Sequence, residues 1–273
     1  MADLQAQIEE LWERRSELEP GDKDARRLVR EAVDLLDAGQ ARIAEVIGGR
    51  VVVHEWLKLA ILLLFRVSKM KTTELGPFEY ADKVPLKKDF KAAGVRVVPG
   101  ASARYGSFLE RGVVLMPSYV NIGAHVGHNT MVATWATVGS CAQIGANVHL
   151  SGGVGIGGVL EPPQAAPVIV EDDCIIGSRC IVAEGARVGR GSVLGAGVIL
   201  TSTVPVIDAQ TGAEVGRGTV PPHSVAITAT REKKFGSRSY GLPCVLVIKH
   251  LSDGERHDKG KLNDILRDHG ATI

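Results

Sequence analysis

One glycine-rich segment near the middle of the chain combines residue types that can bind a ligand and move a proton. Asn147–Gly158 reads NVHLSGGVGIGG, in which His149 stands just before Ser151 and five glycines. Glycine lets an extended ligand approach the backbone and bond its N–H groups, although tight coils of the chain need glycine as well. Imidazole accepts a proton near neutral pH, so His149 and the earlier His128 are candidate general bases; a structural role is the alternative for both.

The element that must position this segment is a repeat of six residues. Counting by sixes from Phe108, with one offset of eight residues, gives fifteen positions that are all apolar, and the fourth residue after most of them is small. The apolar positions are Phe108, Val114, Val120, Val126, Val132, Val138, Ile144, Leu150, Ile156, Val170, Ile176, Val182, Val188, Leu194 and Leu200; the small ones are Ala124, Thr130, Ala136, Ala142, Cys174, Cys180, Ala186 and Ser192.

Neither the 3.6-residue period of a helix nor the alternation of a strand produces this pattern. A prism with three flat faces does, because each face takes one hexapeptide and the aliphatic residues stack inside. One coil then takes about eighteen residues, and the repeat makes about five coils of a parallel β-helix. Because side chains fill such a prism, binding sites must lie on its faces, on loops or between subunits.

The repeat divides the chain into three parts. Residues 1–100 predict an α-rich N-terminal domain, with amphipathic helices at 4–18 and 28–36, a hairpin at Gly48-Gly49 and an apolar helix at 54–68. Residues 101–204 form the β-helix. Residues 205–273 predict a C-terminal cap, with a short strand at Val245–Lys249 and a helix at Lys261–Arg267. The eight-residue excursion around Glu161–Pro167 contains three prolines, which predict a stiff loop that either covers a neighbouring surface or has no function.

Composition excludes several classes of function. The formal charge of the 273 residues is +1, so no overall field favours nucleic acid or an anionic membrane. The most apolar window, Val51–Val67, includes His54, Glu55, Lys58 and Arg66, which argues against a transmembrane span. A charged N-terminus without a signal-peptide pattern, and four cysteines without a CxxC pair, predict the cytoplasm.

Metal binding and cysteine chemistry are the weaker alternatives for the repeat. His125, His128 and His149 are suitable zinc ligands, but their spacings of 3 and 21 residues do not match an eighteen-residue coil, so we predict no metal. Cys174 and Cys180 fall on the small inward position and Cys141 one residue before it, which favours buried hydrophobic roles over nucleophilic ones.

Three stretches, Val113–Gly123, Thr134–Gly145 and Asn147–Pro162, closely resemble bacterial tetrahydrodipicolinate N-succinyltransferases, and the likeness covers almost the whole chain. This resemblance implies a homotrimer of left-handed β-helices with coenzyme A in a groove between adjacent subunits. It also implies that the amine of an open-chain 2-amino-6-oxopimelate attacks the thioester of succinyl-CoA, which is a co-substrate and not a permanently bound cofactor.

The resemblance also assigns site residues. Arg96 matches the family's substrate-binding arginine, whose guanidinium suits a carboxylate, although an ordinary surface arginine is the alternative. The pantetheine arm is expected along Ser151, Gly152, Gly153, Gly155 and Gly157. Ala133, in the substrate-binding position, replaces the family's aspartate, and Ile181 replaces a glutamate. His125 and His128 stand where the family has a tyrosine and an acidic residue, so the base is expected at His128 or His149.

Three hypotheses follow. The first is a diverged acyl-CoA-dependent N-acyltransferase that uses succinyl or acetyl groups, as in the paralogue of tabtoxin-type β-lactam biosynthesis; loss of two carboxylates favours it. The second is the housekeeping N-succinyltransferase of lysine and diaminopimelate biosynthesis, which the near full-length likeness favours. The third is a non-catalytic or zinc-binding trimer. Direct transfer without a covalent enzyme intermediate is expected, because no exposed Cys or Ser–His pair is present in the pattern.

Overall fold

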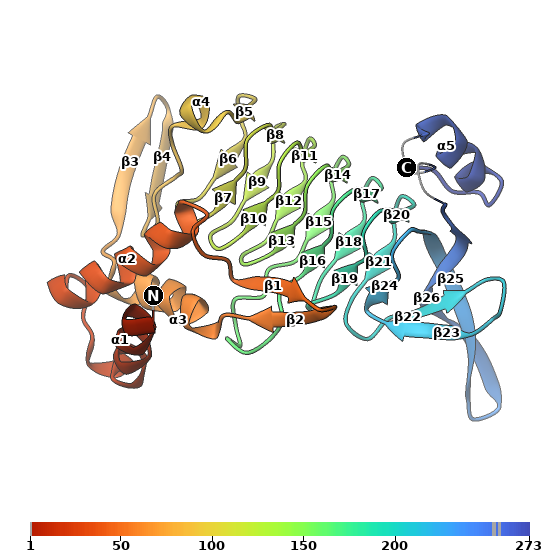
Figure 1. Cartoon of the computed structure of the whole chain (residues 1–273), viewed down its shortest axis with the longest axis horizontal. Helices are drawn as coiled ribbons and strands as arrows, with labels where there is room; N and C mark the ends of the chain where they lie inside the picture. Colours follow the sequence, from red (N-terminus) through yellow and green to blue (C-terminus); the bar gives the residue numbers. More distant parts are fainter. Residues whose placement is uncertain (1, 253–254, 256–257) are drawn as a thin grey trace.

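The computed structural model describes residues 2–252, 255 and 258–273, and a prism of stacked parallel coils forms its centre (Figure 1). Each coil contributes one short strand to each of three parallel sheets. The β5 face contains β5 (Arg96–Val97), β8 (Val114–Leu115), β11 (Met131–Val132), β14 (His149–Leu150), β17 (Ile175–Ile176), β20 (Val193–Leu194) and β25 (Ser224–Phe235). The β6 face contains β6 (Ser102–Ala103), β9 (Tyr119–Val120), β12 (Thr137–Val138), β15 (Gly155–Ile156), β18 (Ile181–Val182) and β21 (Ile199–Leu200). The β7 face contains β7 (Phe108–Leu109), β10 (His125–Val126), β13 (Gln143–Ile144), β16 (Ile169–Val170), β19 (Arg187–Val188) and β24 (Thr219–Val220).

The predicted coil length is confirmed, and two of the predicted core positions are wrong. His125 pairs with Gln143, eighteen residues later, as the repeat requires. In the first coils, however, the buried residues are Leu109 and Leu115, whereas Phe108 and Val114 face outward and are half-buried. The reason is a corner one residue shorter than the others, because the next inward residue after Leu115 is Val120. The stack also exceeds the predicted five coils, since each face has at least six parallel strands.

The small residues of the repeat pack inside the prism as predicted. All eight, including Cys174 and Cys180, are buried at the turns between faces. Cys141 is also buried, but it lies on the outside of the prism and packs against the N-terminal helices with Ile61 and Ile122. Burial raises the pKa of the Cys141 thiol to about 12, so the thiol is protonated and unreactive at neutral pH.

The N-terminal domain packs on one side of the prism (Figure 1). Its predicted elements are present as α1 (Ala2–Glu13), α2 (Lys23–Asp37), β1 (Ala44–Ile47), β2 (Arg50–Val53) and α3 (Glu55–Val67), with a short 3₁₀ turn at Arg15–Glu17. The pattern did not predict α4 (Phe90–Ala93) or the hairpin of β3 (Lys71–Leu75) and β4 (Phe78–Asp82), whose residues are all exposed. A strand pair without a buried face has no apolar alternation from which to predict it.

The proline-rich excursion folds back on its own chain. Lys58 of α3 is fully buried, and its Nζ donates a hydrogen bond of 2.6 Å to the carbonyl of Ala165. Leu160 packs against the same helical core. A buried ammonium needs such a partner, because an unpaired charge away from water is costly. The loop is therefore fixed against the N-terminal domain.

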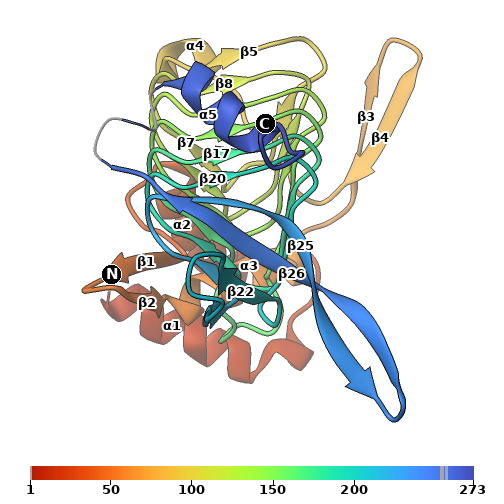
Figure 2. The same cartoon turned by 90° about the vertical axis from the view of Figure 1, so that its right-hand side faces the viewer.

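The C-terminal part closes the far end of the stack. The short strands β22 (Pro205–Asp208) and β23 (Glu214–Arg217) precede a long antiparallel hairpin of β25 and β26 (Arg238–His250), which projects from the body (Figure 2). The predicted strand Val245–Lys249 is thus one part of a longer strand. The predicted terminal helix is α5 (Lys259–Arg267), whose Leu262 and Leu266 cover Ile175 and Val193 of the β5 face. None of the described helices is long and apolar enough to span a bilayer.

The packing of adjacent coils predicts which glycines cannot accept a side chain without loss of stability. A Cβ at Gly139 would lie 2.2 Å from the backbone nitrogen of Gly158, whereas a Cβ at Gly155 would meet only Ile181 Cγ1 at 3.8 Å. We expect Gly139→Ala to lower the free energy of unfolding by about 2 kcal/mol or more, since the backbone of the next coil must move. The matched control Gly155→Ala is expected to change it by less than about 1 kcal/mol. Urea unfolding at one protein concentration measures both, and equal effects of the two variants would contradict this packing.

Candidate functional site

Of the predicted cofactor residues, Ser151, Gly152 and Gly153 lie at the corner between β14 and β15, whereas Gly155 begins β15 and Gly157 follows it. Ser151 stands one coil beyond Ala133, because Val132 pairs with Leu150. The Ser151 hydroxyl is buried, and no hydrogen-bond partner lies near it among the described residues. An unpaired buried hydroxyl costs about 1–3 kcal/mol, so a partner supplied by a ligand would stabilise it.

The four glycines Gly152, Gly153, Gly155 and Gly157 of this segment serve two different purposes. A Cβ at Gly152 would come no nearer than 3.7 Å to the carbonyl of Thr134, and the space at Gly155 is similarly open. A Cβ at Gly157, in contrast, would lie 2.9 Å from the Cβ of Ala183, so Gly157 is required for coil packing. Gly153 has a φ of +68°, which favours glycine whatever the surrounding space. Gly152 and Gly155 are therefore the positions at which a ligand can approach the backbone.

Exposed apolar side chains surround the open glycines. Trp135, in the same corner one coil earlier, is 74% exposed, and Ile181 and Ile199 on the β6 face are 45% and 54% exposed. Ile181 pairs directly with Gly155 in the sheet. Large apolar side chains that remain exposed together indicate a surface for a ligand or another subunit. The isoleucine that replaces the expected glutamate thus extends an apolar surface beside Gly155.

Arg96 and His149 share the β5 face but are not neighbours. Arg96 is exposed on β5, and His149 lies on β14, with β8 and β11 between them. Strands in a sheet are about 4.8 Å apart, so three steps place the two residues about 14 Å apart within one chain. His149 leads directly into the corner of Ser151, whereas His128 lies at the opposite corner, between β10 and β11.

His128 belongs to a different cluster, which the sequence analysis missed. Glu110 accepts a hydrogen bond of 2.9 Å from His125 Nε2, one of 3.1 Å from His128 Nδ1 and one of 2.9 Å from the backbone N–H of His128. Burial acts against ionisation, but these hydrogen bonds hold the pKa of Glu110 below its usual value. Glu110 and His128 are one coil apart in the sequence, and this spacing could have indicated that their side chains meet.

His125 is a buried, neutral histidine. Burial and then the nearby charge of Arg42 lower its pKa to about 4, although Glu110 acts in the opposite direction. Because the ionised Glu110 accepts from Nε2, that nitrogen carries the proton and Nδ1 carries the lone pair. Nδ1 is buried and has no hydrogen-bond partner in the part of the chain that the structure describes. His125 is therefore not charged near neutral pH.

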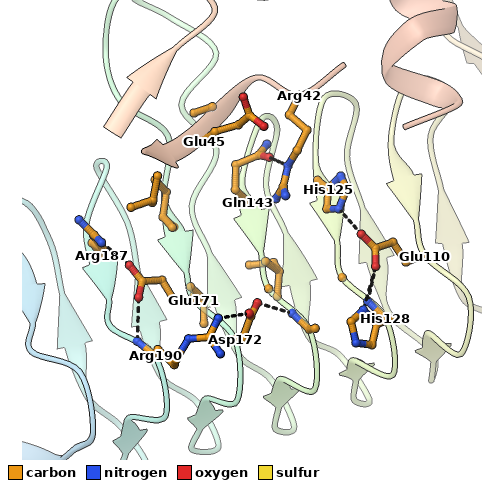
Figure 3. Close-up of a pocket in the computed structure, with 18 residues that line it drawn as sticks. Arg42, Glu45, Glu110, His125, His128, Gln143, Glu171, Asp172, Arg187 and Arg190 are labelled. Carbon is orange, nitrogen blue, oxygen red and sulfur yellow. Dashed lines mark hydrogen bonds and ion pairs between the residues drawn. The ribbon is translucent and has the colours of Figure 1, made fainter. Parts of the chain in front are cut away.

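These residues line a cavity between β1 and the β7 face, with a volume of about 470 Å³ (Figure 3). Near the middle of the cavity, Arg42 Nε donates to Gln143 Oε1 at 3.1 Å, and Glu110, His125 and His128 lie at one end (Figure 3). At the other end the charges pair within the wall: Arg187 with Glu171, and Arg190 with Asp172. Apart from His125 and His128, these lining residues were not predicted: Arg42 and Gln143 lie far apart in the chain, and the spacing of about one coil within the pairs Glu171–Arg187 and Asp172–Arg190 was not recognised.

The three histidines considered as zinc ligands do not converge in this chain. His125 and His128 lie by the β7 face, and His149 lies on the β5 face. Among the described residues, no three His, Cys, Asp or Glu side chains are placed to hold a metal ion.

A prism of hexapeptide coils with an open, glycine-lined corner defines the class of hexapeptide-repeat acyltransferases. Residues 3–67 match the model of the tetrahydrodipicolinate N-succinyltransferase N-terminal domain, and residues 167–202 match the hexapeptide repeat of succinyl-transferase. The chain is 48% identical over 271 residues to 2,3,4,5-tetrahydropyridine-2,6-dicarboxylate N-succinyltransferase of Dechloromonas aromatica, covering 97% of this chain and 98% of the relative. The enzyme of the same name from Acinetobacter baylyi is 48% identical over 275 residues, covering 98% of this chain and 99% of the relative.

The chain belongs to the tetrahydrodipicolinate N-succinyltransferase family and is an acyl-CoA-dependent transferase. Among solved structures, a putative 2,3,4,5-tetrahydropyridine-2-carboxylate N-succinyltransferase from Campylobacter jejuni matches with a TM-score of 0.42 at 18% identity, covering 84% of this chain and 64% of that chain. A hexapeptide-repeat acetyltransferase from Vibrio cholerae, complexed with acetyl-coenzyme A, matches with a TM-score of 0.33 at 16% identity, covering 60% of this chain and 74% of that chain.

The neutral state of His125 predicts a pH dependence of stability. Because folding lowers its pKa from about 6.5 to about 4, the unfolded chain takes up the proton first as the pH falls. The stabilisation is complete above about pH 6.5, and we expect a loss of about 2 kcal/mol in unfolding free energy between about pH 7 and about pH 5. Urea unfolding of His125→Phe at the two pH values is expected to show a loss smaller by that amount.

The exposed-histidine variant His269→Gln serves as the control and is expected to keep the wild-type pH dependence. The window ends above the range in which Glu110 titrates, so its protonation does not contribute. An unchanged pH dependence in His125→Phe would show that His125 is not the buried neutral group.

Proposed function

We propose that this protein transfers an acyl group from acyl-CoA to the amine of an amino dicarboxylate at the corner of Ser151, Gly152 and Gly155. The observation that carries the proposal is the unpaired, buried hydroxyl of Ser151 beside an open glycine backbone. We further propose that the coils wind left-handed and that three chains form the working unit. The exposed Trp135, Ile181 and Ile199 support the association of chains, because a subunit contact would cover them.

Acyl transfer from a thioester requires donors for the oxyanion of the tetrahedral intermediate. Two adjacent donors are present: the hydroxyl of Ser151, and the backbone N–H of Gly152, which makes no hydrogen bond within the described chain. The other backbone N–H groups nearby are occupied, since Gly153 donates to Thr134 and Gly155 to Cys180. We therefore propose that the thioester carbonyl lies against Ser151 and Gly152, with the pantetheine arm along Gly155.

The attacking amine must lose a proton, and neither Ala133 nor Ile181 can accept it. Of the two candidate bases, His149 lies on the strand that enters the corner, whereas His128 lies at another corner and is held by Glu110. We propose His149 as the base within one chain. Arg96, exposed at the start of the same face, is proposed to bind a carboxylate of the acceptor.

The relatives support the housekeeping reaction at least as well as the diverged one. Their names specify an N-succinyltransferase acting on 2,3,4,5-tetrahydropyridine-2,6-dicarboxylate, and the matches cover nearly the full length. We accordingly propose succinyl-CoA as the donor and, as the acceptor, the open-chain amine that this cyclic dicarboxylate forms by adding water; CoA is the leaving group, and the reaction belongs to lysine and diaminopimelate biosynthesis in the cytoplasm. The apolar residues Ala133 and Ile181, in place of two carboxylates, favour a different acceptor. The names of the relatives give no support for a role in tabtoxin biosynthesis.

Free thiol release measures this activity directly. We expect purified protein with tetrahydrodipicolinate to release thiol from succinyl-CoA faster than from acetyl-CoA. Gly155→Trp is expected to abolish CoA binding, because a Cβ at this position meets nothing closer than Ile181 Cγ1 at 3.8 Å and the indole would occupy the space proposed for the pantetheine arm. Gly155→Ala is the matched control. CoA binding without turnover would identify a transferase with another acceptor, whereas unchanged binding by Gly155→Trp would place the cofactor elsewhere.

Arg96→Ala tests the acceptor contact. We expect the KM for a dicarboxylate acceptor to rise at least about tenfold, because a guanidinium–carboxylate hydrogen-bonded pair is lost, while the KM for acyl-CoA stays within about twofold. Steady-state kinetics measure both constants, and Arg96→Lys is expected to be intermediate. If Arg96→Ala leaves both constants unchanged, Arg96 is an ordinary surface residue.

A further inference from the structure

The cavity between β1 and the β7 face lies apart from the acyl-transfer corner. The corner joins the β5 and β6 faces, whereas the cavity lies over the third face of the prism, beneath the β1–β2 hairpin (Figure 3). We propose that this cavity binds an α-amino acid, whose carboxylate lies against Arg42 and whose ammonium group donates to His125 Nδ1.

Arg42 provides an unused cationic donor. Its Nε donates to Gln143, but no carboxylate of the described chain lies within ion-pair distance of its guanidinium. The nearest element, β1, contributes Glu45, whose carboxylate accepts a hydrogen bond of 3.2 Å from His54 instead. Burial lowers the pKa of Arg42, yet a guanidinium remains charged at any physiological pH. A half-buried guanidinium with free terminal N–H groups suits a carboxylate, which it can bind with two parallel hydrogen bonds.

His125 provides a neutral acceptor beside this donor. Its side chain is 7% exposed, and Glu110 fixes the proton on Nε2. The lone pair of Nδ1, on the ring edge turned away from Glu110, has no donor within the described chain and no contact with solvent, so a ligand donor reaches it when the neighbouring side chains shift. Figure 3 shows Arg42 and Gln143 over the middle of the cavity, with His125 on the neighbouring coil. Phe108 packs against the ring, with centroids 5.3 Å apart, and holds it in this orientation.

The two groups together select the chemistry of the ligand. A carboxylate alone would pair with Arg42 and leave Nδ1 unsatisfied, and an amine alone would do the reverse. A carboxylate with a donor on the adjacent carbon satisfies both. Alone, the positive charge of Arg42 disfavours a cation beside His125. Once the ligand carboxylate neutralises Arg42, the charges of Glu110 and Glu45 remain, and these favour ammonium over hydroxyl as that donor.

The remainder of the cavity suits the side chain of an amino acid. The pairs Glu171–Arg187 and Asp172–Arg190 already neutralise one another, so they give a polar wall without demanding a ligand charge. A volume of about 470 Å³ leaves room beyond the carboxylate and ammonium groups. The site therefore differs from a simple anion site in both its polarity and its size.

Titration of the full-length wild-type protein with each of the twenty standard L-amino acids tests the proposal. We expect at least one to bind with a Kd below about 10 mM by calorimetry and to raise Tm. For the tightest one, the corresponding amine without a carboxylate is expected to bind at least about tenfold more weakly, and so is the corresponding α-hydroxy acid. Absence of binding by all twenty would overturn the proposal, and so would an analogue that binds as tightly as the amino acid.

Variants then locate the site. Arg42→Gln and His125→Phe are each expected to weaken binding at least about tenfold, whereas Arg190→Gln, at the other end of the cavity, changes it less than about threefold. Gly155→Trp is expected to retain amino-acid binding, which separates this site from the proposed acyl-transfer corner. Binding that survives in both Arg42→Gln and His125→Phe, or that is lost in Gly155→Trp, would contradict the assignment. The comparisons among ligands use wild-type protein, so they decide the chemistry even if a variant does not fold.

Discussion

The six-residue repeat is the constraint on which the rest of the structure depends. An inward aliphatic residue at each turn fills the prism completely, so no ligand can enter it. Every binding site must therefore lie on a face, at a corner or beneath an added element. The added elements cover different faces. The N-terminal domain covers the β7 face and α5 covers the end of the β5 face, whereas Trp135, Ile181 and Ile199, at the corner beside Gly152 and on the β6 face, remain exposed.

The same constraint explains why the glycines do not share one role. Where adjacent coils meet, as at Gly139 and Gly157, a Cβ would collide with the next coil, and glycine is required for the stack to form. At Gly152 and Gly155 no collision occurs, so packing alone would tolerate a side chain. A position that packing leaves free but that remains glycine suggests close approach of something outside the chain. This distinction is visible only in three dimensions.

Local regularity made much of the fold predictable, and long-range contact made part of the site unpredictable. The repeat and the N-terminal amphipathic helices depend on residues close in sequence, and their periods are direct signals. Arg42 and Gln143 are 101 residues apart, as Lys58 and Ala165 are 107 apart, so no local pattern reveals either contact. The outward shift of Phe108 was equally hidden, because one residue fewer at a later corner moves the register without changing the apolar character of the sequence.

Unpaired buried polar atoms connect the two proposed sites. Within the described chain they are Ser118 Oγ, His125 Nδ1 and Ser151 Oγ. Such an atom lowers stability by about 1–3 kcal/mol unless a ligand or water supplies its partner. Ser118 and Ser151 lie along the corner between the β5 and β6 faces, and His125 lies in the cavity beside Arg42. The hydroxyl of Ser151 can donate to an oxyanion, whereas Nδ1 of His125 can only accept from a donor. The two sites therefore select opposite chemistry, and one ligand group cannot serve both.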